Sequence, residues 1–283
     1  MKTNAYAKIN LVLDLTGVLP DGYHAISTVM QSVSLHDTVC VETDGEDGIK
    51  LSCSEPGIPV DSRNTAYKAA ALFIERAGVK SGVKIHIEKR IPHEAGLGGG
   101  SADAAAVLRL MNALHPGKIN EAELMEIALK VGADVPFCVK GGTALCLNKG
   151  EVMAPLPEFN SWCVIVKPGE GVSTAKAFAA FDSAVKPLRP DMNRFVYYAA
   201  RGEYDTALSG AFNVFEPVAD IASGSRIKKL LTDNGAFFAS MSGSGSAFYG
   251  IFADRTYAEA ASELLGKEFG FSCVCETVGS LTL

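Results

Sequence analysis

The sequence predicts a two-domain α+β protein. Segments with the period-two alternation of strands and segments with the helical period follow one another in mixed order, without the regular strand–helix repeat of a parallel α/β fold. Two glycine-rich stretches, one in each half of the chain, follow strand-like segments. At 283 residues the chain can form one large domain or two ordinary ones. The stretch "LPEFNSW" is the predicted boundary, so we expect domains at 1–157 and 158–283.

Composition excludes several classes of protein. The net charge of −6 leaves no broad basic surface for a nucleic acid. No apolar run reaches the ~18 residues of a membrane span. The seven cysteines, an odd number without a CxxC pair, argue against a disulfide framework and against a zinc knuckle. We therefore expect a cytoplasmic protein that binds neither nucleic acid nor membrane, as a monomer or a homodimer.

The N-terminal segment alternates, which predicts a strand with two distinct faces. A turn at Pro20-Asp21-Gly22 separates it from a second strand-like segment that continues to Val41. We expect one face of the first strand to carry Ala5, Ala7, Ile9, Leu11, Leu13 and Leu15, and the other Tyr6, Lys8, Asn10, Val12 and Asp14.

Cap and breaker residues divide the rest of the first half. Asn64 or Thr65 can cap a helix that ends near Ala77, before Gly78. "VKIHIEK" alternates as a strand, and "GGTALCLNKGE" is typical of a hairpin. A helix with apolar Val107, Leu110, Met111 and Leu114 follows the first glycine stretch, and the next helix opens with a capping box of Asn120 and Glu123 and closes at Gly132.

The first glycine stretch, "IPHEAGLGGGSADAAAV" from Ile91 to Val107, joins a strand directly to a helix. Helix N-termini expose unpaired N–H groups and the positive end of a dipole, so this is a good anion site. No lysine follows the glycines as a P-loop requires, and Ser101 stands where a dinucleotide fingerprint has its third glycine. A flexible connector is the alternative. Because a connector is seldom so short, so rich in glycine and joined straight to a helix, we favour phosphate binding.

A second stretch of small residues, "SMSGSGSA" at Ser240 to Ala247, lies between two apolar strand-like segments. Alone it is no more than a tight turn. Beside a phosphate site, its N–H and hydroxyl groups can approach the same ligand from the other domain.

Together these stretches resemble the GHMP kinase superfamily. Pro92 to Gly98 opens the superfamily's phosphate loop, P-x-x-x-G-L-G-S-S-x-A, and "MSGSGSA" is similar to its C-terminal glycine motif. The resemblance implies an N-terminal ribosomal-protein-S5-like domain, which binds ATP, and a C-terminal ferredoxin-like domain, with the active site between them. "NAYAKINLVL", "PDGYHAISTVMQSVSLHD", "GLGGGSADAA" and "GADVPF" narrow it to the branch whose substrate carries a cytidine diphosphate group.

This closer resemblance implies ATP- and Mg²⁺-dependent phosphorylation of the 2-hydroxyl of 4-diphosphocytidyl-2-C-methyl-D-erythritol, a step of non-mevalonate isoprenoid precursor synthesis. One alternative is another GHMP kinase, of homoserine or mevalonate type. The other is a catalytically silent homologue that binds nucleotide without turnover.

Two residues are implied to be catalytic. Asp134 would orient the attacking hydroxyl, with deprotonation of that hydroxyl left open; from composition alone it is a turn aspartate before the strand-like "VPFCV". Lys8 would stabilise the charge beside it, although a lysine in a strand is ordinarily a solvated edge residue.

The resemblance also assigns both ends of the site. Asn64 has a structural alternative as a helix cap, and Tyr23 and His24 have one as hairpin residues that only pack. The ATP-binding positions are Asn64, Pro92, Gly96, Leu97, Gly98, Gly99, Gly100, Ser101 and Ala102. The substrate-binding positions are Asn10, Tyr23, His24, Thr174, Phe178, Ser242 and Gly243, with His24 on the cytosine edge and Tyr23 and Phe178 on its faces.

The chain departs from the family pattern at a few positions. Glu94 and Ala95 stand where a pair of small residues is usual, and a carboxylate there would lie near the triphosphate. Ala102 replaces a second serine, which leaves Ser101 as the candidate for a magnesium contact. "NVFEP" replaces "NDLEP", and no basic residue stands at Val18 or Leu19.

Overall fold

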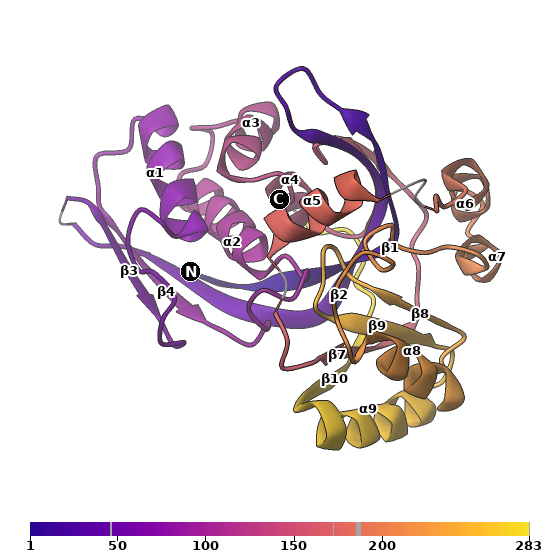
Figure 1. The fold of residues 1–283 in the computed structure, drawn as a ribbon. Helices are drawn as coiled ribbons and strands as arrows, with labels where there is room; N and C mark the ends of the chain where they lie inside the picture. The colour runs from indigo at the N-terminus through magenta and orange to yellow at the C-terminus, as the bar shows by residue number, and fades with distance from the viewer. Residues whose placement is uncertain (46, 172, 185–187, 283) are drawn as a thin grey trace.

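The computed structural model describes residues 1–45, 47–171, 173–184 and 188–282. Two antiparallel-rich sheets, each covered by helices, form the body of the molecule (Figure 1). This confirms the predicted α+β class. In the first part of the chain the elements are β1 Lys2–Val18, β2 His24–Thr43, β3 Ile49–Cys53, α1 Thr65–Ala77, β4 Val83–Glu88, α2 Gly99–Leu114, α3 Glu121–Val131, α4 Val135–Lys140, β5 Thr143–Asn148 and β6 Val152–Pro155. In the second part they are β7 Trp162–Lys167, α5 Thr174–Ser183, α6 Met192–Ala199, α7 Tyr204–Leu208, α8 Gly224–Asp233, β8 Phe238–Met241, β9 Phe248–Phe252, α9 Arg255–Phe269 and β10 Phe271–Glu276.

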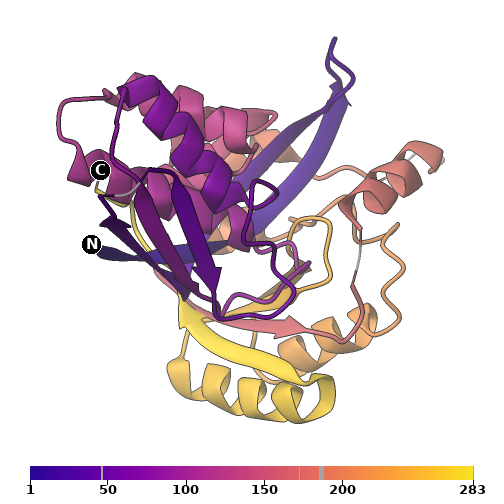
Figure 2. The same cartoon turned by 90° about the vertical axis from the view of Figure 1, so that its left-hand side faces the viewer.

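The long strand β2 organises the first sheet. It pairs with β1 along one edge, and with β4 and β5 at different levels of the other edge. β3 joins β4 in parallel, and β6 joins β5 as the expected hairpin. The far ends of β1 and β2 project from the body as a hairpin in both views (Figure 2).

The two faces of β1 differ from the prediction. A β-bulge interrupts the pairing with β2 between Asn10 and Val12, so the strand has one extra residue there. Leu13 and Leu15 pair with Thr28 and Ile26, on the side of the sheet where Asn10 pairs with Met30. Their side chains pack in a hydrophobic cluster that is separate from the cluster containing Ile9. The prediction of one continuous apolar face on β1 was therefore wrong beyond Leu11. The bulge shifts the side-chain alternation by one residue, so the later leucines lie on the opposite face.

The helices α1 to α4 pack together over the first sheet, where Figure 1 draws them in purple and magenta. α1 begins at the predicted cap and ends at Gly78, which has a left-handed φ of 62°. The capping box that opens α3 is present in full. α2 presents small side chains to the core, which allows close packing against α1 and the sheet: Ala102, Ala104, Ala105 and Ala106 are buried.

The segment "VPFCV" is a short helix, α4, and not a strand. Its apolar residues are buried on all sides, so their periodicity does not distinguish the two structures. Pro136 lies in the first turn of α4, where the backbone N–H that a proline lacks would have no partner within the helix. Asp134 is consequently the residue before a helix, at its N-terminus.

The second sheet has the strand order β10-β7-β9-β8, with α8 and α9 packed on it. The chain changes from the first sheet to the second between Pro155 and Trp162, within the stretch predicted as the domain boundary. The domain limits themselves stay a prediction. Cys163, Ile165 and Tyr249 of the second sheet are buried in the same core cluster as residues of the first sheet, so this cluster extends across the interface between the two halves.

Candidate active site

A cavity of about 1060 Å³ opens between the two halves of the molecule. Its wall includes β1, the β1–β2 turn, the first glycine loop, the start of α2, and α5. All but two of the site residues predicted from the sequence line it. The two that do not are Ala102 and Ser242, which are buried behind the wall.

The first glycine loop requires glycine at two positions. Gly96 and Gly98 have φ values of 72° and 70°, in the left-handed region that glycine adopts without strain. A Cβ at Gly96 would lie 2.0 Å from the carbonyl oxygen of Ser242. Gly98 caps α2 without a side chain, and no acidic residue follows in the first turn. This helix start lies on the cavity wall, and its use as an anion site stays a prediction.

The second glycine loop packs directly on the first. The Ser242 hydroxyl donates to the Gly96 carbonyl over 2.9 Å, and the Ala247 N–H donates to the Ala95 carbonyl over 3.1 Å. These bonds explain why Ser242 is fully buried rather than on the cavity wall. Gly243 reaches the wall instead. The two motifs thus form one continuous structure across the interface between the two sheets.

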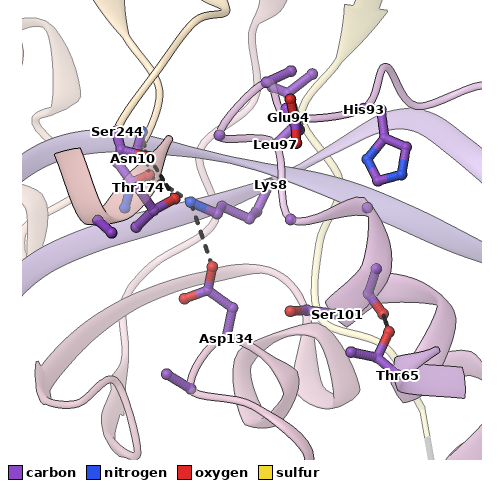
Figure 3. Close-up of a pocket in the computed structure, with 18 of the residues that line it drawn as sticks. Lys8, Asn10, Thr65, His93, Glu94, Leu97, Ser101, Asp134, Thr174 and Ser244 are labelled. Carbon is purple, nitrogen blue, oxygen red and sulfur yellow. Dashed lines mark hydrogen bonds and ion pairs between the residues drawn. The ribbon is translucent and has the colours of Figure 1, made fainter. Parts of the chain in front are cut away.

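Lys8 and Asp134 come together beside these loops (Figure 3). The Lys8 Nζ lies 3.6 Å from Asp134 Oδ2 and donates to Asn10 Oδ1 over 2.8 Å. The Lys8 N–H also donates to the Leu97 carbonyl over 3.0 Å, which fixes β1 against the glycine loop. Lys8 is 4% exposed, so its ammonium group is largely shielded from water and its interaction with a nearby anion is strong.

The Asp134 carboxylate remains available to a ligand. It stands at the N-cap of α4 but makes no capping hydrogen bond, and 30% of the side chain is exposed. A carboxylate at a helix start ordinarily bonds the helix N–H groups. Here it faces the cavity and Lys8 instead (Figure 3).

The amide groups of Asn10 and Asn64 already have partners in the protein. Asn10 Oδ1 accepts from Lys8 and from the Gly243 N–H, and its Nδ2 donates to Thr28 over 2.9 Å. Asn64 caps α1 and donates to the Pro59 carbonyl over 2.7 Å. Both residues line the cavity, and their observed contacts position neighbouring groups. Direct contact of either residue with a ligand stays a prediction.

The β1–β2 turn and α5 form the opposite end of the cavity. The rings of His24 and Phe178 lie 4.7 Å apart and tilted by 32°, and His24 Nε2 is 2.8 Å from Asp182 Oδ1. The Tyr23 ring is 64% exposed. The Thr174 hydroxyl bonds the Ser244 hydroxyl at 3.0 Å, so α5 also contacts the second glycine loop. The predicted base-binding residues are therefore neighbours, and their roles stay predictions.

The two unusual residues of the first loop have different surroundings. Glu94 is exposed with a φ of 50°, and its carboxylate lies near Gly171, where an added Cβ would be 3.5 Å from Glu94 Oε2. Ala102 lies in the hydrophobic core, 1% exposed, on the side of α2 away from the cavity. Its N–H donates to the Gly98 carbonyl within the helix. Ser101, by contrast, lines the cavity.

A buried charged cluster beneath the first loop was not found from the sequence. Lys89 pairs with Asp37 and, over 2.7 Å, with Asp103. Asp37 also accepts the N–H groups of Arg90 and Ile91, which lead into the loop. Burial opposes the charged form of Lys89, but attraction to the two carboxylates prevails and raises its pKa. Burial raises the pKa of Asp103 to about 7, although Lys89 acts in the opposite direction. The only sign of this cluster in the sequence was the charged residue Asp103 in the alanine-rich segment that forms α2.

Two residues of "NVFEP" support the second loop and were also missed. Asn213 donates to the carbonyl groups of Met241 and Gly243 over 2.9 and 2.6 Å. Glu216 accepts from the Ser240 hydroxyl and the Met241 N–H. This segment therefore positions the second glycine loop from behind.

The described residues also limit the chemistry of the site. They contain no cluster of three or more histidine, cysteine, aspartate or glutamate side chains able to hold a metal ion by themselves. No helix within the described ranges is long and apolar enough to cross a membrane. The reactive features of the cavity include the open carboxylate of Asp134, the buried ammonium of Lys8, the buried Lys89–Asp103 pair and a helix start rich in N–H groups.

Known proteins are similar to this chain in sequence and fold. The family model for the GHMP kinases N terminal domain matches residues 64–142, and the model for GHMP kinases C terminal matches residues 225–270. The 4-diphosphocytidyl-2-C-methyl-D-erythritol kinase of Clostridium botulinum is 42% identical, over 95% of this chain and 97% of that protein. The enzyme of the same name from Caldicellulosiruptor bescii is also 42% identical, over 99% of this chain and 100% of the relative.

Solved structures agree with this assignment. A crystal structure of 4-(cytidine 5'-diphospho)-2C-methyl-D-erythritol kinase superposes with a TM-score of 0.83 at 33% identity, covering 99% of this chain and 100% of the other. A homoserine kinase from Cytophaga hutchinsonii has a TM-score of 0.74 at 20% identity, over 97% of this chain and 95% of the other, which shows a shared fold alone. The chain therefore belongs to the GHMP kinases and, within them, to the family of 4-diphosphocytidyl-2-C-methyl-D-erythritol kinases.

Proposed function

We propose that this protein transfers the γ-phosphoryl group of ATP to the 2-hydroxyl of 4-diphosphocytidyl-2-C-methyl-D-erythritol, in the cytoplasm and in the service of isoprenoid precursor synthesis. The observation that carries this proposal is the Lys8–Asp134 pair, 3.6 Å apart, in the same cavity as the helix start that follows the first glycine loop. Phosphoryl transfer demands in-line positioning and charge neutralisation more than covalent chemistry, and these groups supply both.

The triphosphate of ATP would bind at the first glycine loop and the start of α2. Gly98 to Ser101 offer N–H groups there without side-chain obstruction. Lys8 is a buried cation beside the loop, and it would stabilise the charge that moves onto the transferred group. Asp134 would accept a hydrogen bond from the attacking hydroxyl, hold it in line, and take its proton as the bond to phosphorus forms.

The residues of the cavity fit a magnesium ion that arrives with ATP. Mg²⁺ is usually bound through one or two carboxylates or hydroxyls together with substrate phosphates, and not in a cage of protein ligands. The Asp134 carboxylate and the Ser101 hydroxyl are such groups on the cavity wall. Mg²⁺ would neutralise phosphate charge there, and Ser101 is the hydroxyl we propose to contact it in the absence of one at Ala102.

The cytidine end of the substrate would bind between the β1–β2 turn and α5. Tyr23 and Phe178 would stack on the base, and His24 would bond its edge, because aromatic faces and edge hydrogen bonds recognise a single base. Thr174 and Gly243 lie on the wall between this end and Lys8, where the diphosphate and erythritol would pass. The chain would act on this small molecule as a monomer or a homodimer.

A coupled assay for ADP tests the proposal against its two alternatives. With ATP and Mg²⁺, we expect turnover of the cytidine substrate and none of mevalonate or homoserine. Turnover of either of these alcohols would keep the chemistry and refute the assignment of the base-binding residues. A folded protein that binds the cytidine substrate and ATP without releasing ADP would be a silent homologue.

A further inference from the structure

The most informative unexplained contact joins His24, at the start of β2, to Asp182, near the end of α5. His24 Nε2 lies 2.8 Å from Asp182 Oδ1, and both residues line the cavity. The His24 side chain is 19% exposed and that of Asp182 is 53% exposed. Asp182 belongs to no motif that pointed to the site, and the proposed reaction gives it no role.

This contact requires a proton on Nε2 of the His24 ring. An ionised carboxylate can only accept a hydrogen bond, so Nε2 must donate. In a neutral ring the other nitrogen, Nδ1, is then an acceptor. Throughout the part of the chain that the structure describes, no protein group bonds Nδ1. The Phe178 ring, 4.7 Å away, restricts the orientation of the imidazole from one face.

An imidazole held in this way distinguishes one pyrimidine from another. Cytosine presents an amino group at position 4, which donates hydrogen bonds, whereas uracil presents a carbonyl oxygen there, which only accepts. An acceptor at His24 Nδ1 can therefore bind the amino group of cytosine, whereas it offers no donor to the carbonyl oxygen of uracil. A polar group that is left unpaired at a ligand interface costs more binding free energy than a hydrogen bond gains.

We propose that Asp182 is a specificity-determining positioning residue, which holds His24 as a hydrogen-bond acceptor and so selects a 4-amino over a 4-oxo pyrimidine. The inference rests on the proposed cytidine substrate. The competing explanation is an ordinary surface ion pair, which contributes little to stability and nothing to the choice of base.

Base preference separates these explanations. The experiment measures kcat and KM for the cytidine substrate and for its uridine analogue, with wild-type protein and with the variants Asp182→Ala and Asp182→Asn. Asp182→Ala removes the acceptor, and Asp182→Asn can either accept from Nε2 or donate to it. Both variants therefore free the His24 ring to adopt either tautomer. The control is Asp233→Asn, since Asp233 is 51% exposed, pairs with Lys229 on α8 and lies outside the cavity wall.

We expect Asp182→Ala to lower the ratio of kcat/KM for cytidine over uridine by up to about tenfold, the loss of one hydrogen bond between neutral groups. The change should lie in KM for the cytidine substrate, while KM for ATP stays constant. Asp182→Asn should lower the ratio by a smaller factor, and Asp233→Asn should not alter it. An unchanged ratio in both Asp182 variants would overturn the inference.

The failure of the proposed function would look different. If wild-type protein turned over neither substrate, equilibrium binding of CDP and UDP to the same proteins would measure the preference directly. A wild-type preference for CDP that the Asp182 variants lose would still support the role of Asp182. Equal binding of the two nucleotides by wild-type protein would refute it.

Discussion

The Lys8 ammonium lies 3.6 Å from the Asp134 carboxylate and 2.8 Å from the Asn10 amide oxygen, at a point where three separate parts of the chain meet. β1 supplies Lys8 and Asn10, the start of α4 supplies Asp134, and the second glycine loop donates its Gly243 N–H to the same amide oxygen over 2.9 Å. A buried cation held next to a partly exposed carboxylate is a preorganised arrangement for transferring a charged group.

Replacing Asp134 tests the proposed role of the carboxylate. Asp134→Asn keeps the size of the side chain, and no capping bond of α4 is lost because Asp134 makes none. We expect kcat to fall by about 10²–10⁴-fold, the usual contribution of a positioned acid or base, with both substrates still bound. Steady-state kinetics and thermal unfolding measure the two effects. A fully active variant would exclude this role.

Lys8→Ala should impair a different part of the reaction. Loss of the buried ammonium removes charge stabilisation at the transferred group and leaves Asn10 Oδ1 with one donor, from Gly243. We expect kcat to fall by about 10²–10³-fold and KM for ATP to rise. ADP release over a range of ATP concentrations separates the two constants. If kcat were preserved and stability alone were reduced, Lys8 would be a structural residue.

Gly96 should be intolerant of any side chain. A Cβ there would lie 2.0 Å from the Ser242 carbonyl oxygen, and the φ of 72° disfavours other residues. Gly96→Ala should therefore destabilise the protein by about 2–4 kcal/mol and disturb the contact between the glycine loops. Gly169→Ala is the matched control, since a Cβ at Gly169 meets nothing within 4 Å. Equal denaturation midpoints of the two variants would contradict the packing of the loops.

Asp103 should make stability dependent on pH. Burial raises its pKa from the ordinary 3.8 to about 7, so the folded protein binds a proton that the unfolded chain has released at intermediate pH. The contribution of Asp103 to the unfolding free energy is complete below the pKa of its carboxyl in the unfolded chain, and it is lost as the pH rises through 7. Asp103→Asn cannot titrate, and it should reduce the decline in unfolding free energy between pH 5 and 8 by roughly 1–3 kcal/mol.

Denaturant unfolding of wild type and variant at several pH values measures this difference. The variant keeps an oxygen that can accept from Lys89, so the comparison isolates the charge of the carboxylate. If both proteins lost the same free energy over this pH range, the coupling between Asp103 and the folded state would be absent.

Sequence patterns predicted the elements whose signals are local. The cap at Asn64, the stop at Gly78 and the capping box of Asn120 all lie where short-range hydrogen bonds determine the helix end. The bulge in β1 left no such signal, because Leu11, Val12 and Leu13 are all apolar and do not show where the alternation shifts. For the same reason, uniformly buried residues made the short helix α4 indistinguishable from a strand.

Site residues were predicted where they belong to recognisable motifs, and they were missed where they support those motifs from other parts of the chain. Lys8 and Asp134 were assigned through the resemblance, and the structure brings them together. Asp37 lies in β2, Lys89 follows β4 and Asp103 lies in α2, and no sequence pattern links the three, so only the folded chain reveals the cluster. Asp182 reaches His24 through α5, which has no motif of its own at that position.

The most direct test of phosphoryl transfer in this cavity is ³¹P NMR of the product formed from ATP, Mg²⁺ and 4-diphosphocytidyl-2-C-methyl-D-erythritol. We expect one new phosphomonoester resonance, coupled to the 2-position of the erythritol and formed in equal amount to ADP, with wild-type protein and not with Asp134→Asn. ADP without a phosphorylated alcohol, or the same product at the same rate from Asp134→Asn, would contradict transfer through the Lys8–Asp134 pair.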